Sequence, residues 1–173
     1  MKGAKPAHQA RSKQTRDKIV AALDRLLKDR PFEQVSVAEI AAEAGVSVGA
    51  VYQRFENKDA LIPVLFELYR QRLAEEHERR ARAPAPEGLR ATLKAAMNQA
   101  WTMMARHGHL MRAAHLHARL RPDLVGPEWA ALIDDSRRSI QAVIETHRAE
   151  ITHPDPDLAA ETLTYFLNTA LIE

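Results

Sequence analysis

Residues 42–61 have the sequence AEAGVSVGAVYQRFENKDAL, and this stretch decides the expected fold of the chain. It predicts two helices joined by a tight turn. Gly45 lies in the turn and the small Ala41 lies four residues before it, so two helices can cross closely there. Tyr52 and Phe55 fall on the second helix, which completes the pattern of a helix-turn-helix.

Capping residues mark the helix starts around this stretch. Ser36 and Glu39 have the spacing of a capping box, which predicts a short helix over residues 37–44. Ser47 is placed to cap the helix after the turn, and Asn57 is placed to cap the one after that.

Helical periodicity continues along the rest of the chain, without the alternating pattern of a strand. Pro63 would remove one backbone hydrogen bond from the fourth helix, so we expect a kink near residues 59–63. Pro84 and Pro86 end that helix. The expected helices cover residues 12–28, 37–44, 47–55, 57–82, 88–106, 109–120 and 127–150, with a last one from about Asp155. The expected fold class is therefore all-α.

Composition sets limits on the kind of protein. The 173 residues are 46% hydrophobic, which suits one large domain or two small ones with a buried core. The absence of cysteine excludes disulfides, thiolate zinc sites and cysteine nucleophiles. No apolar run approaches the ~20 residues of a membrane span, and the N-terminus lacks the apolar stretch of a secretion signal. We therefore expect no membrane partner and a cytoplasmic location.

Positive charge is concentrated at the N-terminus, although the net charge of the chain is only +2. Six basic residues in positions 1–18 face only Asp17; they are Lys2, Lys5, Arg11, Lys13, Arg16 and Lys18. Beside a helix-turn-helix, such a segment suits the neutralisation of DNA phosphates. A solubilising tail is the alternative interpretation.

The residue types of the helix-turn-helix suit a helix that enters the major groove of DNA. Gly49 and Ala50 are small where the backbone of such a helix would come nearest the bases. Tyr52 can bring its hydroxyl to a phosphate, and Lys58 near a helix N-terminus can contact another. Glutamine can bond adenine twice, and apolar groups can touch a thymine methyl. The side chains expected at base edges are Ser47, Val48, Ala50 and Gln53.

The capping box, the turn glycine, Tyr52, Phe55 and Lys58 together resemble the DNA-binding domain of the TetR family of transcriptional regulators. The resemblance is strong over about residues 12–62 and weaker over the helical remainder. It implies phosphate contacts from Ser36, Ser47, Tyr52 and Lys58, and base contacts from Val48, Ala50 and Gln53. Ala50 stands where the family often has threonine, so the contact that the threonine hydroxyl would make with the DNA backbone is in doubt. Arg54 stands where an aromatic residue or histidine is common, and it could add a contact.

The resemblance also implies an organisation for the whole chain. Residues 1–62 would form a DNA-binding domain, with the helix-turn-helix at about 37–55, and residues 63–173 a regulatory domain for ligand binding and dimerisation. A homodimer formed through the 127–150 helix and the last helix would bind a near-palindromic operator on double-stranded DNA. The expected function is a repressor released by a small-molecule ligand, with activation as a further possibility. The alternative is a helical ligand-binding or scaffolding protein with a degenerate DNA-binding head.

A pocket for a small hydrophobic or amphipathic ligand is expected in the second half of the chain. Large or flexible apolar residues would line it, with a few polar anchors. The candidates are Met97, Trp101, Met104, Leu110, Met111, His115, Tyr165 and Asn168. An ordinary core that contains methionine is the alternative interpretation.

Other chemical patterns in the sequence are weaker. Gly45 to Gly49 match the Gly-x-Ser-x-Gly pattern of the nucleophile elbow in hydrolases. Such an elbow needs a preceding strand and a sheet, and neither is expected here. The four histidines within residues 107–117 lack the i,i+4 spacing of a helical metal site. We therefore expect no enzyme activity, no metal and no cofactor apart from the effector. The sequence stops at residues 171–173 inside an apolar helix, so truncation of the last helix is a further expectation.

Overall fold

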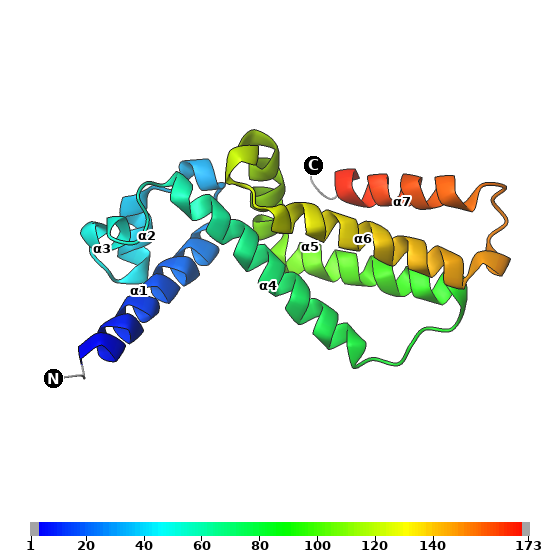
Figure 1. The fold of residues 1–173 in the computed structure, drawn as a ribbon, viewed down its shortest axis with the longest axis horizontal. Coiled ribbons are helices and arrows are strands. Elements are labelled where there is room, and N and C mark those ends of the chain that lie inside the picture. Colours follow the sequence, from blue (N-terminus) through cyan, green and yellow to red (C-terminus); the bar gives the residue numbers. More distant parts are fainter. Residues whose placement is uncertain (1–3, 171–173) are drawn as a thin grey trace. The chain divides into compact units, whose positions relative to one another are not determined.

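The computed structural model describes the backbone of residues 4–170, and side chains from residue 10 onward except those of residues 164 and 167–170. Within this part all regular secondary structure is helical, with seven α-helices and four 3-10 helices (Figure 1). The expected all-α class is confirmed. None of these helices combines the length and apolar composition that a membrane span needs. The chain divides into two compact units between Leu65 and Phe66.

The first unit is built on three packed helices. The α-helices that it contains or begins are α1 (Ala4–Leu26), α2 (Val37–Ala44), α3 (Val48–Tyr52) and α4 (Ile62–Ala81), with 3-10 helices at Phe32–Gln34 and Asp59–Leu61. Helix α1 packs against α2 and α3. The fully buried core side chains include Ile19, Leu23, Ile40, Val51 and Leu61.

Caps fix both ends of α2 and the start of α3, as the sequence predicts. The Ser36 hydroxyl accepts a hydrogen bond from the Glu39 amide at 3.2 Å, and the Ser36 amide donates to the Glu39 carboxylate at 2.8 Å. Gly45 ends α2 with φ 65° and ψ 37°, a left-handed conformation that favours glycine. Ser47 caps α3 by accepting a bond from the Ala50 amide at 3.1 Å.

Two expected helix boundaries and one expected kink in this unit are wrong. Helix α1 begins at Ala4 rather than Ser12, because its first turns are rich in alanine, lysine, glutamine and arginine, which favour helix without needing an apolar stripe. Helix α3 ends at Tyr52 instead of near Phe55. The expected kink at Pro63 does not occur, because α4 begins at Ile62 and a proline in the first helical turn costs no helical hydrogen bond.

The second unit contains the rest of α4 and three further helices. These are α5 (Gly88–Leu120), α6 (Pro127–Thr146) and α7 (Pro156–Ala170), with 3-10 helices at Pro122–Leu124 and Arg148–Glu150. Helix α6 packs against both α5 and α7, and the three run alongside one another in Figure 1. Buried side chains of α5, such as Met103, Leu110 and Met111, form much of the core.

The sequence predicts two helices over 88–120, and the structure joins them into α5 with a break. His107 has φ −132° and ψ 16°, outside the helical region. The predicted cap of the last helix is confirmed, since the Asp155 carboxylate accepts a bond from the Leu158 amide at 3.0 Å. The expected truncation at residues 171–173 falls outside the described residues.

Candidate nucleic-acid interface and ligand cavity

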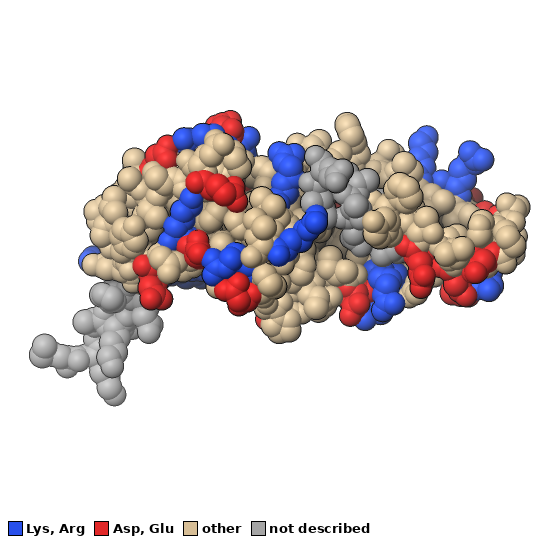
Figure 2. Space-filling view, turned by 90° about the horizontal axis from the view of Figure 1, so that it is seen from above, with Lys and Arg blue, Asp and Glu red and all other residues tan. Residues whose placement is uncertain are grey.

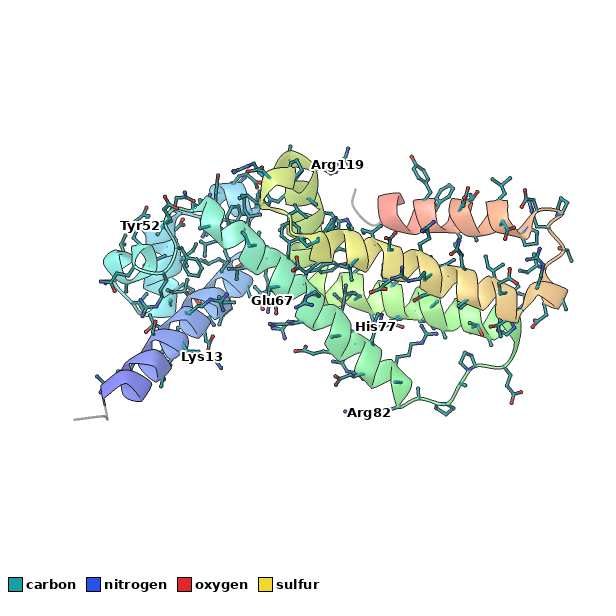
Figure 3. The ribbon with its side chains drawn as sticks, viewed as in Figure 1. Lys13, Tyr52, Glu67, His77, Arg82 and Arg119 are labelled. Atoms are coloured by element: carbon teal, nitrogen blue, oxygen red, sulfur yellow. The ribbon has the colours of Figure 1, made fainter. Side chains whose placement is uncertain are left out.

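Helix α3 buries one side and exposes the other. Val51 and Phe55 are buried in the first unit and anchor the helix, while Val48 and Tyr52 are 41% and 52% exposed (Figure 3). At about 100° per residue, positions i, i+1, i+4 and i+5 fall within an arc of about 140°, so the exposed positions are contiguous. This face consists of Val48, Gly49 and Tyr52 together with Gln53, the residue that caps the C-terminal end of α3. It offers a glycine backbone, an amide and a phenol to a partner.

The serines and Ala50 lie at the margin of that face. The hydroxyl of Ser36 donates to the Glu39 carboxylate at 2.7 Å, so the capping box occupies it. The hydroxyl of Ser47 accepts the Ala50 amide and keeps its own proton for donation to an acceptor such as a phosphate oxygen. Ala50 is half-buried. Ser47 is therefore better placed for an outside contact than Ser36.

The two cations of the predicted interface are held by the fold. The Arg54 guanidinium donates to the carbonyl of Ser12 at 3.3 Å and to that of Ala50 at 2.8 Å, which ties α3 to α1. The Lys58 ammonium donates to the carbonyl of Glu33 at 2.9 Å and lies 4.8 Å from the centre of the Phe32 ring. Arg54 and Lys58 still place positive charge at the predicted interface, but each side chain already has a structural role.

Basic residues of α1 are exposed, and elsewhere in the unit Arg25 is paired with Glu43 and Arg30 with Glu39. Arg11, Lys13, Arg16 and Lys18 are exposed, whereas the side chains of Lys2 and Lys5 lie outside the described residues. On the face drawn in Figure 2, basic and acidic side chains alternate over the surface.

The carboxylate of Glu39 in the first unit has a strongly lowered pKa. The backbone amide and hydroxyl of Ser36, together with Arg30 at 2.7 Å, lower the pKa of Glu39 to about 2. The capping box therefore stays charged and intact over the ordinary range of pH.

A cavity of about 280 Å³ lies inside the second unit, between α4, α5 and α6. At one end its lining includes Tyr69, Met111 and His115, and at the other His77, Arg80 and Gln99. The volume is just below the range for small-molecule sites, roughly 300–1,000 Å³.

Two of the eight predicted pocket residues, Met111 and His115, line this cavity. Leu110 is fully buried and Met104 half-buried, and neither belongs to the lining. Met97, Trp101 and Tyr165 are exposed, and the side chain of Asn168 lies outside the described residues.

The sequence analysis missed most of the lining. The contributions of α4 and α6, such as Glu76, Arg80 and Ser136, were not expected, because those helices carry no signal that separates a cavity wall from a packed core.

One end of the cavity is aromatic and uncharged. The His115 ring lies 4.7 Å from the Trp129 ring and 5.8 Å from the Tyr69 ring, measured between centroids. Burial lowers the pKa of His115 to about 4 and raises the pKa of Tyr69 to about 12. Both side chains are therefore neutral near pH 7.

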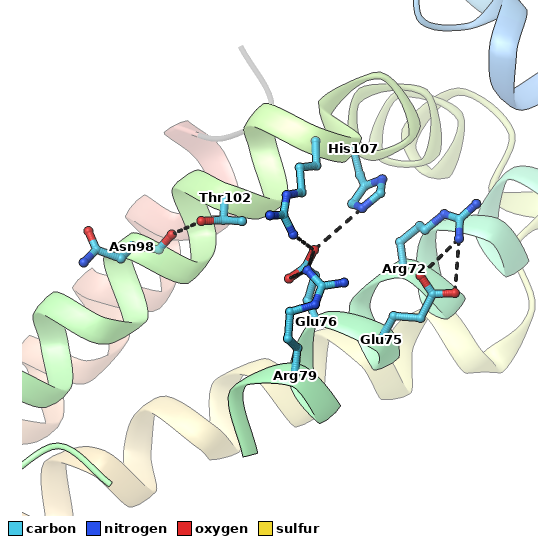
Figure 4. A network of polar contacts seen from close by, with 8 residues as sticks. Arg72, Glu75, Glu76, Arg79, Asn98, Thr102 and His107 are labelled. Atoms are coloured by element: carbon cyan, nitrogen blue, oxygen red, sulfur yellow. Dashed lines mark hydrogen bonds and ion pairs between the residues drawn. The ribbon is translucent and has the colours of Figure 1, made fainter. Parts of the chain in front are cut away.

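A buried carboxylate of the cavity lining has three basic partners (Figure 4). Glu76 is only 5% exposed. Its oxygens lie 2.7 Å from Arg79, 3.2 Å from Arg106 and 3.8 Å from Nε2 of His107. Burial alone would raise the pKa of Glu76, but the hydrogen bonds and charges of Arg79 and Arg106 outweigh it and hold the pKa below its ordinary value. The network joins α4 to the break in α5.

No group of three or more histidine and acidic side chains is placed to hold a metal ion in the part of the chain that the structure describes.

Comparison with known proteins finds similarity within the first unit. Residues 19–65 match the family model described as bacterial regulatory proteins, tetR family. The "HTH-type transcriptional regulator TtgR" of Pseudomonas putida is 36% identical over 76 residues, which are 44% of this chain and 34% of that protein. The "Probable HTH-type transcriptional regulator ArpR", also of Pseudomonas putida, matches to the same extent. The chain thus spans about a third of the length of the curated relatives it matches.

Solved structures extend the similarity of fold over nearly the whole chain. A crystal structure of a gamma-butyrolactone receptor (ArpA-like protein) has a TM-score of 0.61 at 23% identity, covering 94% of this chain and 81% of that one. FadR from Bacillus subtilis, in complex with stearoyl-CoA, has a TM-score of 0.61 at 19% identity, covering 90% and 84%. The expected resemblance to the tetR family of bacterial regulatory proteins is confirmed for residues 19–65, the segment that matches the family model.

Proposed function

We propose that this chain is a sequence-specific DNA-binding transcriptional regulator, a repressor that a small-molecule ligand releases from its operator. The observation that carries the proposal is the exposed face of α3, defined above as Val48, Gly49, Tyr52 and Gln53, inside the segment that matches the tetR family. A helix anchored on one side and presenting small and polar groups on the other suits the major groove.

In this proposal residues 1–62 form the DNA-binding domain, and the contacts divide into two kinds. Val48, Ala50 and Gln53 contact base edges, where they carry sequence information. Phosphate contacts fix the position of the head without reading sequence. They come from Ser36, Ser47, Tyr52, Arg54 and Lys58. Because Arg54 and Lys58 are already hydrogen-bonded within the fold, they act as fixed positive charges rather than as mobile arms.

We further propose that residues 63–173 form the regulatory domain and that the protein acts as a homodimer in the cytoplasm, where bacterial DNA lies. Leu158, Tyr165 and Phe166 of α7 are exposed apolar side chains, which support an interface made with α6. Two recognition helices about 34–36 Å apart would then match a near-palindromic operator. Light scattering is expected to give twice the 19.4 kDa mass of the chain. A 19 kDa monomer at micromolar concentration would contradict the dimer.

The ligand part of the proposal rests on the cavity and on the structural neighbours. One neighbour is a gamma-butyrolactone receptor, and another is in complex with stearoyl-CoA. The cavity between α4, α5 and α6 supports a hydrophobic or amphipathic effector for this chain.

The decisive experiment is selection of bound sequences from a random duplex pool with the full chain at moderate salt. We expect a near-palindromic consensus. Gln53→Ala is expected to relax specificity at one position of each half-site, at a cost of about 1–3 kcal/mol. Tyr52→Phe is expected to weaken binding to all sequences alike, because it removes a phosphate contact.

The matched control is Gln71→Ala, which changes the same residue type at an exposed position of α4. It is expected to leave the consensus and the affinity unchanged. Recovery of no consensus, or a consensus that Gln53→Ala leaves intact at every position, would contradict the assigned reading face.

A further inference from the structure

The lining of the cavity in the second unit follows α4 over several helical turns. The α4 side chains that line it recur at spacings of three and four, from Tyr69 through Leu73, Glu76 and His77 to Arg80. These eleven steps correspond to about 16 Å at 1.5 Å per residue. Since C–C bonds of about 1.5 Å advance about 1.3 Å per carbon in a zigzag, a straight chain of about ten to twelve carbons fits this length.

The end of the cavity near Tyr69 suits an apolar chain. Met103 and Met111 are buried flexible side chains that adapt to an irregular apolar ligand. Tyr69 and His115 are neutral there because both are largely removed from solvent. The side chains that line this end of the cavity carry no charge, so the polar part of a ligand belongs at the other end.

The end near Arg80 carries an excess of positive charge. Three arginines, Arg79, Arg80 and Arg106, stand against one carboxylate, that of Glu76, so this group has a net charge of +2. Asp135 also lines the cavity, but it is paired with Arg138 and adds no net charge. Arg80 donates to the Gln99 side chain at 2.7 Å, which holds its guanidinium between α4 and α5.

We propose that the ligand of this cavity is an elongated amphipathic acid, with its anionic head at Arg80 and its apolar body toward Tyr69 and Met111. A guanidinium can bind a carboxylate through two parallel hydrogen bonds, which gives the head a defined position. The inference rests on the proposed function in one respect only: it takes this acid to be the ligand that releases the protein from its operator.

Binding can be measured through Trp129, whose ring lies next to the His115 ring of the cavity wall. The chain has two tryptophans, and Trp101 is exposed and outside the lining, so the Trp101→Phe variant leaves Trp129 as the only tryptophan. The probes are sodium decanoate, decan-1-ol and decylammonium chloride, each below its aggregation concentration. We expect decanoate to bind at least tenfold more tightly than decanol, and decylammonium to bind least.

Substitution of the proposed head-group partner tests the assignment. Arg80→Gln, made in the same background, is expected to lower decanoate affinity at least tenfold and to leave decanol affinity unchanged. Arg82→Gln is the control, because Arg82 is an exposed arginine outside the lining (Figure 3). Equal loss for acid and alcohol in Arg80→Gln would assign Arg80 a structural role and overturn the inference. So would a preference for the alcohol or the cation in the unsubstituted chain.

DNA binding is measured separately, so the two proposals can fail separately. Decanoate that binds but does not release DNA would support the ligand class and contradict its role as the releasing ligand. A chain that binds its DNA consensus but gives no saturable decanoate signal would overturn the ligand class and leave the DNA-binding proposal standing.

Discussion

Substitution by alanine at two glycines of the helix-turn-helix should change the stability of the first unit in opposite directions. Gly45 has φ 65°, and a methyl group at its Cβ position would meet no atom within 4 Å. The cost of Gly45→Ala is therefore backbone strain alone, about 1–2 kcal/mol for a left-handed alanine. Gly49 lies inside α3, where a Cβ would meet only the Ser47 hydroxyl at 3.9 Å, an ordinary contact. Gly49→Ala should stabilise the head by about 0.5–1 kcal/mol.

Amide hydrogen exchange of α1 and α2 in the full chain measures the opening of the first unit without interference from the second. We expect exchange of the buried Ile40 amide to be about tenfold faster in Gly45→Ala and slower in Gly49→Ala. A Gly45→Asn variant should lose less than the alanine variant, because asparagine tolerates the left-handed region. Equal protection in both alanine variants would refute the argument that the turn conformation, and not glycine content, governs stability here.

The same pair separates stability from function. If the backbone of Gly49 comes close to the bases, as the proposed function requires, the methyl group of Gly49→Ala weakens DNA binding while it stabilises the head. A Gly49→Ala head that is both more stable and equally tight in DNA binding would place the groove contact elsewhere on α3.

Further predictions concern the second unit. The pKa of His115 is about 4 in the folded protein and 6.5 in the unfolded chain, so between pH 7 and pH 5 only the unfolded state takes up the proton. The free energy of unfolding should therefore fall by about 1 kcal/mol over this pH range. Urea unfolding of the Trp101→Phe chain, followed by Trp129 fluorescence, checks this, and His115→Gln in the same background should lack that part of the pH dependence. Leu110→Ala should cost about 2–5 kcal/mol in the same assay, since Leu110 is fully buried, and a loss under about 1 kcal/mol would contradict its core position. Asp155→Ala should cost about 0.5–2 kcal/mol, measured as faster amide exchange in α7, through loss of the cap on Leu158.

Local chemistry explains why the first unit was predictable from sequence. The capping box of Ser36 and Glu39, the cap by Ser47 and the turn at Gly45 each involve residues within four positions of one another. Such interactions depend on spacing alone, so their geometry follows from the sequence. Burial of Val51 and exposure of Tyr52 then follow from the helical period.

The errors arise where spacing does not decide the outcome. The effect of Pro63 depends on whether α4 begins before or at Ile62, and helix starts are rarely fixed to a residue by periodicity. Met97 and Trp101 have the size of pocket residues, yet they lie on the exposed side of α5, while Met103 and Met111 line the cavity. Residue type indicates what could line a cavity, but the rotation of a helix about its axis decides which residues do.

Helix α4 supplies side chains to both units, since Ile62 and Leu65 are buried in the first and Tyr69 lines the cavity of the second. A ligand in the cavity can change DNA affinity only as far as it binds one conformation of the protein better than another. Linkage then makes the coupling reciprocal: if decanoate lowers the affinity for operator DNA tenfold, saturating operator must lower the affinity for decanoate tenfold. Both factors can be measured on the same Trp101→Phe chain. Unequal factors would mean that decanoate also acts outside the cavity, because a single coupled site admits only one value.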